Sequence, residues 1–154
     1  MGFFVGVDVG GTTSTIAIGD DRRKLRYVSD QFSTRSTDGP SATIEDIAEQ
    51  ILIGLARCDT TLADVHQVCI ATPGPATLDG ILLKTPNLRA DLWDRFPIRQ
   101  ALQDRLRQHT AGINVSYVGD GQAAALGEFA IRTAQLDWST CDTFASDSRV
   151  IPRN

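Results

Sequence analysis

A chain of 154 residues can bury one hydrophobic core, and a composition of 42% hydrophobic and 22% charged residues excludes wholesale disorder. The net charge of −4, from 19 acidic and 15 basic residues, argues against nucleic acid as a partner, because phosphate binding needs a basic face. No apolar run is long enough to cross a bilayer and residues 1–5 enter a strand without a basic leader, so we expect a cytoplasmic protein with no membrane partner.

The first part of the chain predicts antiparallel hairpins. Residues 3–9 are apolar on both faces, which is typical of a strand at the centre of a sheet. Gly10 to Thr13 form a turn, residues 14–19 return as a second strand, and a third strand is expected over 25–32. A polar loop over residues 36–41 ends this unit.

Helical spacing of apolar residues predicts a helix after this loop, with Thr43 as its N-cap and Asp46 in its first turn. The apolar stripe consists of Ile44, Ile47, Ile51, Leu52 and Leu55. Residues 65–71 then form a buried strand. Residues 76–96 carry turn signals, so we expect a hairpin and a loop there and no helix.

The remaining elements complete a β-β-β-α-β-α-β-α order. Pro97 suits the first turn of a helix, residues 113–118 form a strand, and residues 122–134 form the last helix. This order predicts a mixed α/β sheet covered by helices on both faces. Residues 136–154 show no sustained period, so we expect a domain over 1–135 followed by an irregular tail.

The turn after the first strand carries residues suited to phosphate. Gly10 and Gly11 let backbone N–H groups approach an anion closely, and the hydroxyls of Thr12 and Thr13 can donate to phosphate oxygens. A carboxylate such as Asp8 can hold a divalent cation through water. A tight hairpin, in which the glycines supply positive φ and Asp8 caps the turn, explains the same residues equally well. No G-x-G-x-x-G segment opens a helix, which excludes the dinucleotide fingerprint.

Asp120 falls where a strand gives way to a helix, at the carboxyl end of the sheet, where open α/β folds bind ligands. A carboxylate there can accept a proton from a hydroxyl nucleophile. Asp is also a common N-cap, and for Asp120 taken alone the cap interpretation is preferred. Glu128, further along the same helix, is interpreted as a solvated residue.

Two proline-containing segments predict a loop suited to sugar hydroxyls. Thr72-Pro73-Gly74-Pro75 is followed by a second segment that contains Pro86 and Asn87. The Asn87 amide offers donors and an acceptor, which suits a vicinal diol, and Pro86 stiffens the loop. Trp93 can stack on a sugar, although a large aromatic in a loop more often fills a core.

These motifs follow one another in a specific order. They are Asp-x-Gly-Gly-Thr from residue 8, Thr-Pro-Gly-Pro with a downstream Pro-Asn-Leu-x-x-x-x-Trp, and Gly-Asp-x-x-Ala-Ala-Ala-Leu-Gly-Glu from residue 119. Together, over residues 3–135, they resemble the ROK family of sugar kinases and repressors in the actin-like ATPase superfamily. The resemblance implies a ribonuclease H-like fold with a five-stranded sheet of order 3-2-1-4-5.

The resemblance also implies an ATP-dependent sugar kinase, such as a glucokinase or hexokinase, that uses Mg²⁺ and takes a hexose. The first phosphate loop would comprise Asp8, Gly10, Gly11, Thr12 and Thr13. Asp8 would also be the metal ligand. Gly74, Asn87 and Asp120 would contact the sugar, and Asp120 would be the base that activates the hydroxyl attacking the γ-phosphate.

The chain departs from the family pattern at several points. Gly119 stands where the family usually has Asn, and Gly121 stands where Ala is usual. A second phosphate loop, the Glu and His sugar ligands, a Cys-rich zinc site and a winged-helix segment have no counterpart in the sequence. We therefore expect an N-terminal kinase domain that is inactive alone, binds ATP poorly and forms a homo-oligomer. A sugar-sensing domain without catalysis and another actin-like ATPase are the alternatives.

Overall fold

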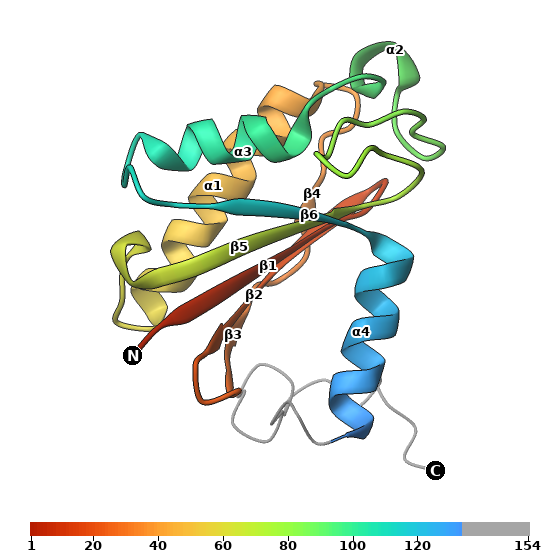
Figure 1. The fold of residues 1–154 in the computed structure, drawn as a ribbon. Helices are drawn as coiled ribbons and strands as arrows, with labels where there is room; N and C mark the ends of the chain where they lie inside the picture. The colour runs from red at the N-terminus through yellow and green to blue at the C-terminus, as the bar shows by residue number, and fades with distance from the viewer. Residues whose placement is uncertain (134–154) are drawn as a thin grey trace.

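The computed structural model describes residues 1–133, which form a mixed sheet with helices on both sides (Figure 1). The strands are β1 (Phe3–Val9), β2 (Thr13–Asp20), β3 (Leu25–Val28), β4 (Phe32–Ser33), β5 (Val65–Thr72) and β6 (Val115–Gly119). Their order is β3-β2-β1-β5-β6, and β4 pairs with β2 beside this path. Without the two-residue β4, this is the predicted order 3-2-1-4-5, which is confirmed.

The first three strands are antiparallel, and β1, β5 and β6 run parallel. The third strand, predicted as one piece over 25–32, is divided into β3 and β4. Ser29 explains the division, because its side-chain Oγ accepts the Ile16 N–H at 2.9 Å in place of a backbone carbonyl. The buried Ser29 hydroxyl thus interrupts the hydrogen-bond ladder along β2, at the point between β3 and β4.

The helices are α1 (Pro40–Arg57), α2 (Ala90–Trp93), α3 (Ile98–Arg107) and α4 (Asp120–Arg132), with a 3₁₀ turn η1 (Leu62–Asp64) before β5. The predicted start of α1 is wrong. Gly39 is the N-cap and Pro40 occupies the first turn, where its fixed φ suits a helix and its missing N–H costs nothing. Thr43 lies buried inside α1, and Asp46 pairs with Arg35 at 3.4 Å instead of serving the first turn.

The expectation that residues 76–96 contain no helix is wrong, because the single-turn helix α2 lies in this segment. The hairpin expected in the same segment is confirmed by the bridge between Ala76 and Leu82. The expected helix after Pro97 is also confirmed, with Pro97 itself as the N-cap of α3.

Helices α1 and α3 pack together on one face of the sheet and bury its core, while α4 stands on the opposite side (Figure 1). Strand β1 alternates, so that Val5, Val7 and Val9 are buried while Phe4, which is 45% exposed, and Asp8 are open. The expected position of β1 at the centre of the sheet is confirmed, although only one of its faces is buried. Helix α4 buries none of its residues, so the second face of the sheet is covered only in part.

No helix among residues 1–133 is both long and apolar enough to span a membrane. Cys58 and Cys69 are half-buried, and no disulfide joins these two cysteines of the described part of the chain. Cys141, the expected domain boundary at residue 135 and the tail over 136–154 lie outside the described residues.

Candidate functional site

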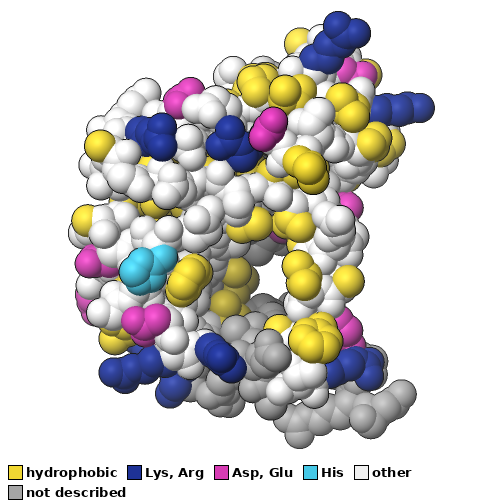
Figure 2. Space-filling model, in the orientation of Figure 1, with side chains coloured by type: hydrophobic (Ala, Val, Ile, Leu, Met, Phe, Trp, Pro, Cys, Tyr) yellow, Lys and Arg dark blue, Asp and Glu magenta, His cyan; other side chains and the backbone are white. Residues whose placement is uncertain are grey.

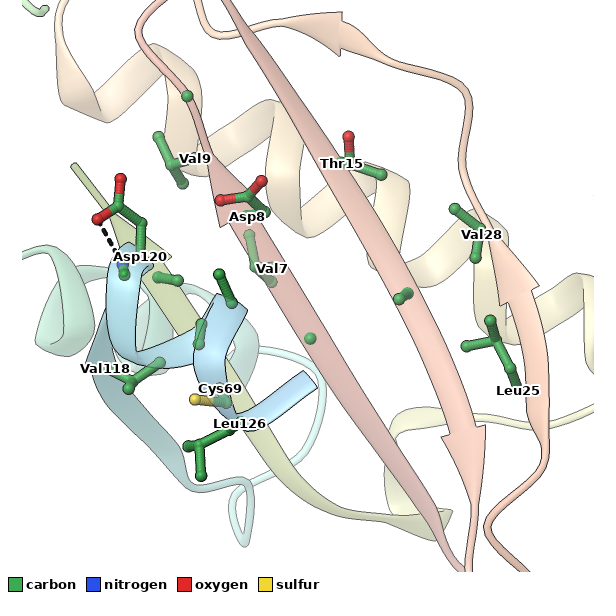
Figure 3. Close-up of a pocket in the computed structure, with 17 residues that line it drawn as sticks. Val7, Asp8, Val9, Thr15, Leu25, Val28, Cys69, Val118, Asp120 and Leu126 are labelled. Carbon is green, nitrogen blue, oxygen red and sulfur yellow. Dashed lines mark hydrogen bonds between the residues drawn. The ribbon is translucent and has the colours of Figure 1, made fainter. Parts of the chain in front are cut away.

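A cleft of about 890 Å³ lies between the open face of the sheet and α4. Its floor is formed by residues of β1, β2 and β5, with β3 and β6 at its edges, and α4 supplies one wall with Ala123, Ala124 and Leu126. Figure 2 shows the hollow, with hydrophobic side chains on its walls. The cleft is apolar over most of its length and carries carboxylates at one end (Figure 3).

The two carboxylates are those of Asp8, near the end of β1, and Asp120, directly after β6. Strands β1 and β6 both run parallel to β5, so their carboxyl ends meet at one edge of the sheet, where open α/β folds bind ligands. Figure 3 shows both side chains at the same end of the cleft, opposite Leu25 and Leu126. The structure thus brings together two residues that are far apart in the sequence.

Desolvation in the cleft, and then the negative charge of Asp120, raise the pKa of Asp8 above its ordinary value. Both causes disfavour the ionised form of Asp8. A cation near the two carboxylates would offset the effect of the Asp120 charge on the pKa of Asp8, because it would screen their mutual repulsion. The electrostatics of this end of the cleft therefore favour positive charge.

Asp120 is the first residue of α4, and Gly119 is the N-cap. The interpretation of Asp120 as an N-cap is therefore wrong. Its Oδ1 accepts the N–H of Gly121 at 2.7 Å, which leaves the second carboxylate oxygen for other partners in an exposed position. Glu128 pairs with Arg132 at 2.5 Å on the exposed surface of α4, as expected for a solvated helix residue.

The Gly10–Thr13 turn closes with a hydrogen bond from the Gly10 N–H to the Thr13 carbonyl at 2.9 Å. The tight hairpin at this turn is confirmed, but positive φ among the described glycines occurs only at Gly39, Gly74 and Gly80, so Gly10 and Gly11 do not supply it. Glycine is needed at positions 10 and 11 because neither position has room for a side chain. A Cβ at Gly10 would lie 2.5 Å from the Thr13 carbonyl oxygen. The side chains of Thr12 and Thr13 are exposed.

Thr34, a buried residue just after β4, holds this turn from behind, and the sequence contains no signal for it. Its N–H donates to the Thr12 carbonyl at 2.9 Å, and its Oγ1 donates to the Gly10 carbonyl at 2.8 Å. Because that proton is used, the Ser14 hydroxyl is the donor in its 2.8 Å bond with Thr34 Oγ1. Thr43 of α1 in turn donates to the Thr34 carbonyl. These bonds tie the turn to the core.

Asn87 lies against the same turn from the opposite side. The backbone and Cβ of Asn87 pass so close to Gly11 that a Cβ there would lie 2.6 Å from the Asn87 Cβ. Gly74, at φ +82°, is similarly close to Lys84 and Pro86 in the preceding part of the loop. The structure therefore brings Asn87 next to the Gly10–Thr13 turn, and the Asn87 side chain is exposed there.

Trp93 takes no part in this site. It is 0% exposed, and its Nε1 donates to the Ser36 carbonyl at 2.8 Å. The interpretation of Trp93 as a core residue is confirmed, and stacking on a sugar is excluded by its burial. Its role is to fasten α2 to the loop that precedes α1.

The carboxylates fit a divalent cation that is bound together with phosphate. Residues 1–133 contain no group of three or more His, Cys, Asp and Glu side chains that could hold a metal by themselves. Magnesium, however, keeps several waters and binds through one or two carboxylates plus the phosphates of a nucleotide. Asp8 and Asp120 supply carboxylates of this kind at one end of the cleft.

The family model described as the ROK family matches residues 4–140. The chain belongs to the ROK family. Among curated proteins, no relative matches this chain. Many solved structures do, and they share the arrangement of the sheet and helices described above.

A ROK hexokinase from Thermus thermophilus is 24% identical, with a TM-score of 0.67 over 83% of this chain and 38% of that chain. An inorganic polyphosphate/ATP-glucomannokinase from Arthrobacter sp. strain KM is 26% identical, with a TM-score of 0.66 over 83% and 48%. A ROK family glucokinase from Streptomyces griseus, solved with glucose and AMPPNP, is 26% identical, with a TM-score of 0.59 over 83% and 36%. The chain thus spans less than half the length of each.

A ROK family transcriptional regulator, a homologue of the Escherichia coli MLC protein, has the same fold, at 18% identity and a TM-score of 0.65 over 88% of this chain and 32% of that chain. The fold is therefore that of the actin-like sugar kinases, and it serves both kinases and regulators. Membership of the family does not separate these two roles, so residues of the site have to carry the argument.

Proposed function

We propose that this chain is the sugar-binding and catalytic-base part of an ATP-dependent hexose kinase that acts in the cytoplasm. One observation carries the proposal: the Asp120 carboxylate shares one end of the cleft with Asp8 and the start of the Gly10–Thr13 turn, and Asn87 packs on that turn. A base, a phosphate-binding turn and a hydroxyl ligand are the parts that phosphoryl transfer to a sugar needs. The S. griseus glucokinase, a relative with the same fold, was solved with a sugar and an ATP analogue together.

In this reaction Asp120 accepts the proton of a sugar hydroxyl, whose oxygen forms a new bond to the γ-phosphorus of ATP. The bond from that phosphorus to the bridging oxygen breaks, and ADP leaves with the electron pair. The exposed hydroxyls of Thr12 and Thr13 donate to phosphate oxygens, and Gly74 and Asn87 orient the sugar. Mg²⁺, held by Asp8, would supply charge stabilisation to the phosphates.

The second candidate is a sugar-sensing domain without catalysis. Gly119 favours it, because the residue before Asp120 offers no side chain to a sugar. Under this alternative the chain would bind a hexose at Asn87 and Gly74, and no phosphate would be transferred.

The deciding experiment titrates the wild-type chain with glucose and with Mg-ATP by NMR and measures hexose-dependent ADP release by the full-length gene product. We expect glucose to shift the amide signals of Gly74 and Asn87, and Mg-ATP to shift those of residues 10–13. Asp120→Asn should lower the rate of ADP release by roughly 10²–10⁴, the usual contribution of a general base. Glu128→Gln, on the exposed surface of the same helix, is the matched control and should keep the rate.

The outcomes separate the two candidates. Glucose binding without ADP release in the full-length protein would support the sensing role. Near-normal turnover by a folded Asp120→Asn protein would remove the base from the mechanism. A wild-type chain that binds neither glucose nor Mg-ATP would refute both candidates.

We also propose that the chain self-associates. Leu126 and Phe129 of α4 are 63% and 58% exposed, and Phe4 of β1 is exposed on the open face of the sheet. Leu126 and Phe129 are three residues apart on α4 and therefore lie side by side, and an exposed apolar helix face of this kind is commonly covered by a second copy. Light scattering should give a mass of at least twice 16.7 kDa. A monomer at every concentration tested would contradict the proposal.

A further inference from the structure

The loop that presents Asn87 rests on two glycines from distant parts of the chain. Gly11, in the turn after β1, lies under Asn87, and Gly74, after β5, lies under Pro86. An added Cβ at Gly11 would come within 2.6 Å of the Asn87 Cβ and 2.8 Å of the Asn87 carbonyl oxygen. An added Cβ at Gly74 would come within 2.7 Å of Pro86 Cδ. Real Cβ atoms do not make contacts this short, so neither position has room for a side chain.

Gly11 needs to be glycine for this contact and not for its backbone conformation. Positive φ, which would by itself favour glycine, is absent at Gly11. The three atoms nearest to its added Cβ all belong to Asn87. At Gly10, one residue earlier, the three nearest atoms all belong to Thr13 of the same turn. The two adjacent glycines therefore serve different contacts.

The loop cannot absorb a displacement by bending, because it is fastened at both sides of Asn87. The Thr85 N–H and Oγ1 both donate to Asp94 Oδ1, at 3.1 and 2.8 Å, and Thr85 is buried. The Leu88 N–H donates to the Thr85 carbonyl at 3.2 Å, and the Leu88 side chain is buried in the core. A side chain at Gly11 would therefore move Asn87 itself.

We infer that Gly11 is a positioning residue for the sugar, because it sets the position of Asn87. The Gly10–Thr13 turn and the loop that carries Asn87 therefore move together. The inference rests on the proposed function, because it gives Asn87 a ligand. It follows that a phosphate group on the Gly10–Thr13 turn and a hexose at Asn87 influence each other's binding. By thermodynamic linkage the two effects have the same size.

The test measures glucose affinity by NMR titration in the wild-type chain and in Gly11→Ala. A displaced Asn87 loses its hydrogen bond to the sugar, and the upper end of the usual contribution of one such bond corresponds to about tenfold in affinity, so we expect the Kd for glucose to rise about tenfold in Gly11→Ala. Gly112→Ala, between α3 and β6 and outside the cleft, is the matched control: its added Cβ would meet nothing within 4 Å, and its Kd should stay within about twofold. An unchanged Kd in a folded Gly11→Ala chain would overturn the inference.

A second measurement needs no substitution and decides the matter if Gly11→Ala does not fold. The Kd of the wild-type chain for glucose is measured without and with saturating tripolyphosphate, which serves as the phosphate probe. We expect a change of roughly fivefold, at the lower end of measured coupling between sites. Equal values under the two conditions would overturn the inference.

Failure of the proposed function gives a different result. A wild-type chain that binds no glucose refutes that function, and the positioning of Asn87 is then tested without ligand. The side-chain amide signal of Asn87 should move in Gly11→Ala and stay in place in Gly112→Ala. An unmoved signal would show that Gly11 does not set the position of Asn87.

Discussion

Thr34→Val tests whether a single buried hydroxyl holds the Gly10–Thr13 turn. Valine keeps the shape of threonine and the backbone bond from residue 34 to the Thr12 carbonyl, but it removes Oγ1. The Gly10 carbonyl then loses its donor and the Ser14 hydroxyl loses its acceptor, both inside the protein. Each unsatisfied buried group costs about 1–3 kcal/mol, and the Gly10 carbonyl is only partly buried. We therefore expect the free energy of unfolding to fall by about 2–4 kcal/mol.

The assay is urea denaturation of the wild type, Thr34→Val and the control Thr34→Ser. Serine keeps both hydrogen bonds and removes one buried methyl group, which costs about 0.8 kcal/mol. The loosened turn in Thr34→Val should also bind tripolyphosphate more weakly, while Thr34→Ser should restore most of that affinity. If serine costs more stability than valine, the hydroxyl does not hold the turn and the reasoning is refuted.

Three further predictions concern Asp8, Asn87 and Gly119. Because the pKa of Asp8 is raised on folding, the ionised carboxylate destabilises the folded protein at pH values above the raised pKa, and this cost is absent below the unfolded pKa of about 3.9. Asp8→Asn should therefore raise the free energy of unfolding at pH 7 but not at pH 3. Urea denaturation that showed the larger gain at pH 3 would contradict this. Asn87→Ala should weaken glucose binding about tenfold and change stability by no more than about 0.5 kcal/mol, since its side chain is exposed; titration and melting curves check both. Gly119→Asn should stabilise the chain by about 0.4–1 kcal/mol, because its φ of −67° suits any residue; a loss of stability in urea would count against it.

The sheet could be predicted because its signals are local. Apolar strands at residues 3–9 and 65–71, and the turn between the first two strands, correspond to β1, β5 and the β1–β2 hairpin with shifts of at most one residue. The place of Asp120 between a strand and a helix was also predicted from the local pattern, and it is confirmed. The order of the strands came from the family resemblance, which the family match confirms. Local pattern and motif order therefore suffice for the framework and for the end of the cleft that carries the carboxylates.

The parts that were missed depend on contacts between distant segments. Thr43 has the residue type of an N-cap, but Pro40 begins the helix three residues earlier, and the Thr43 hydroxyl bonds to Thr34 in the loop after β4. Helix α2 is a single turn, too short to show a period. Strand β1 is apolar apart from Asp8, yet one of its faces lines the cleft, which only the position of α4 reveals. A local pattern cannot report which partner covers a residue.

Gly119 shows how the structure separates a chemical departure from a structural one. The backbone there, at φ −67° and ψ 146°, suits any residue, and an added Cβ would lie 3.6 Å from Gln122 Oε1, an ordinary contact. Nothing in the fold therefore requires glycine at 119, in contrast to Gly11 and Gly74, where no side chain fits. The fold permits a side chain at position 119, and the chain has none. The missing side chain therefore changes which groups can bind beside Asp120. Under the proposed function, the scaffold that positions Asp120 is intact and Gly119 bears on which hexose the site takes.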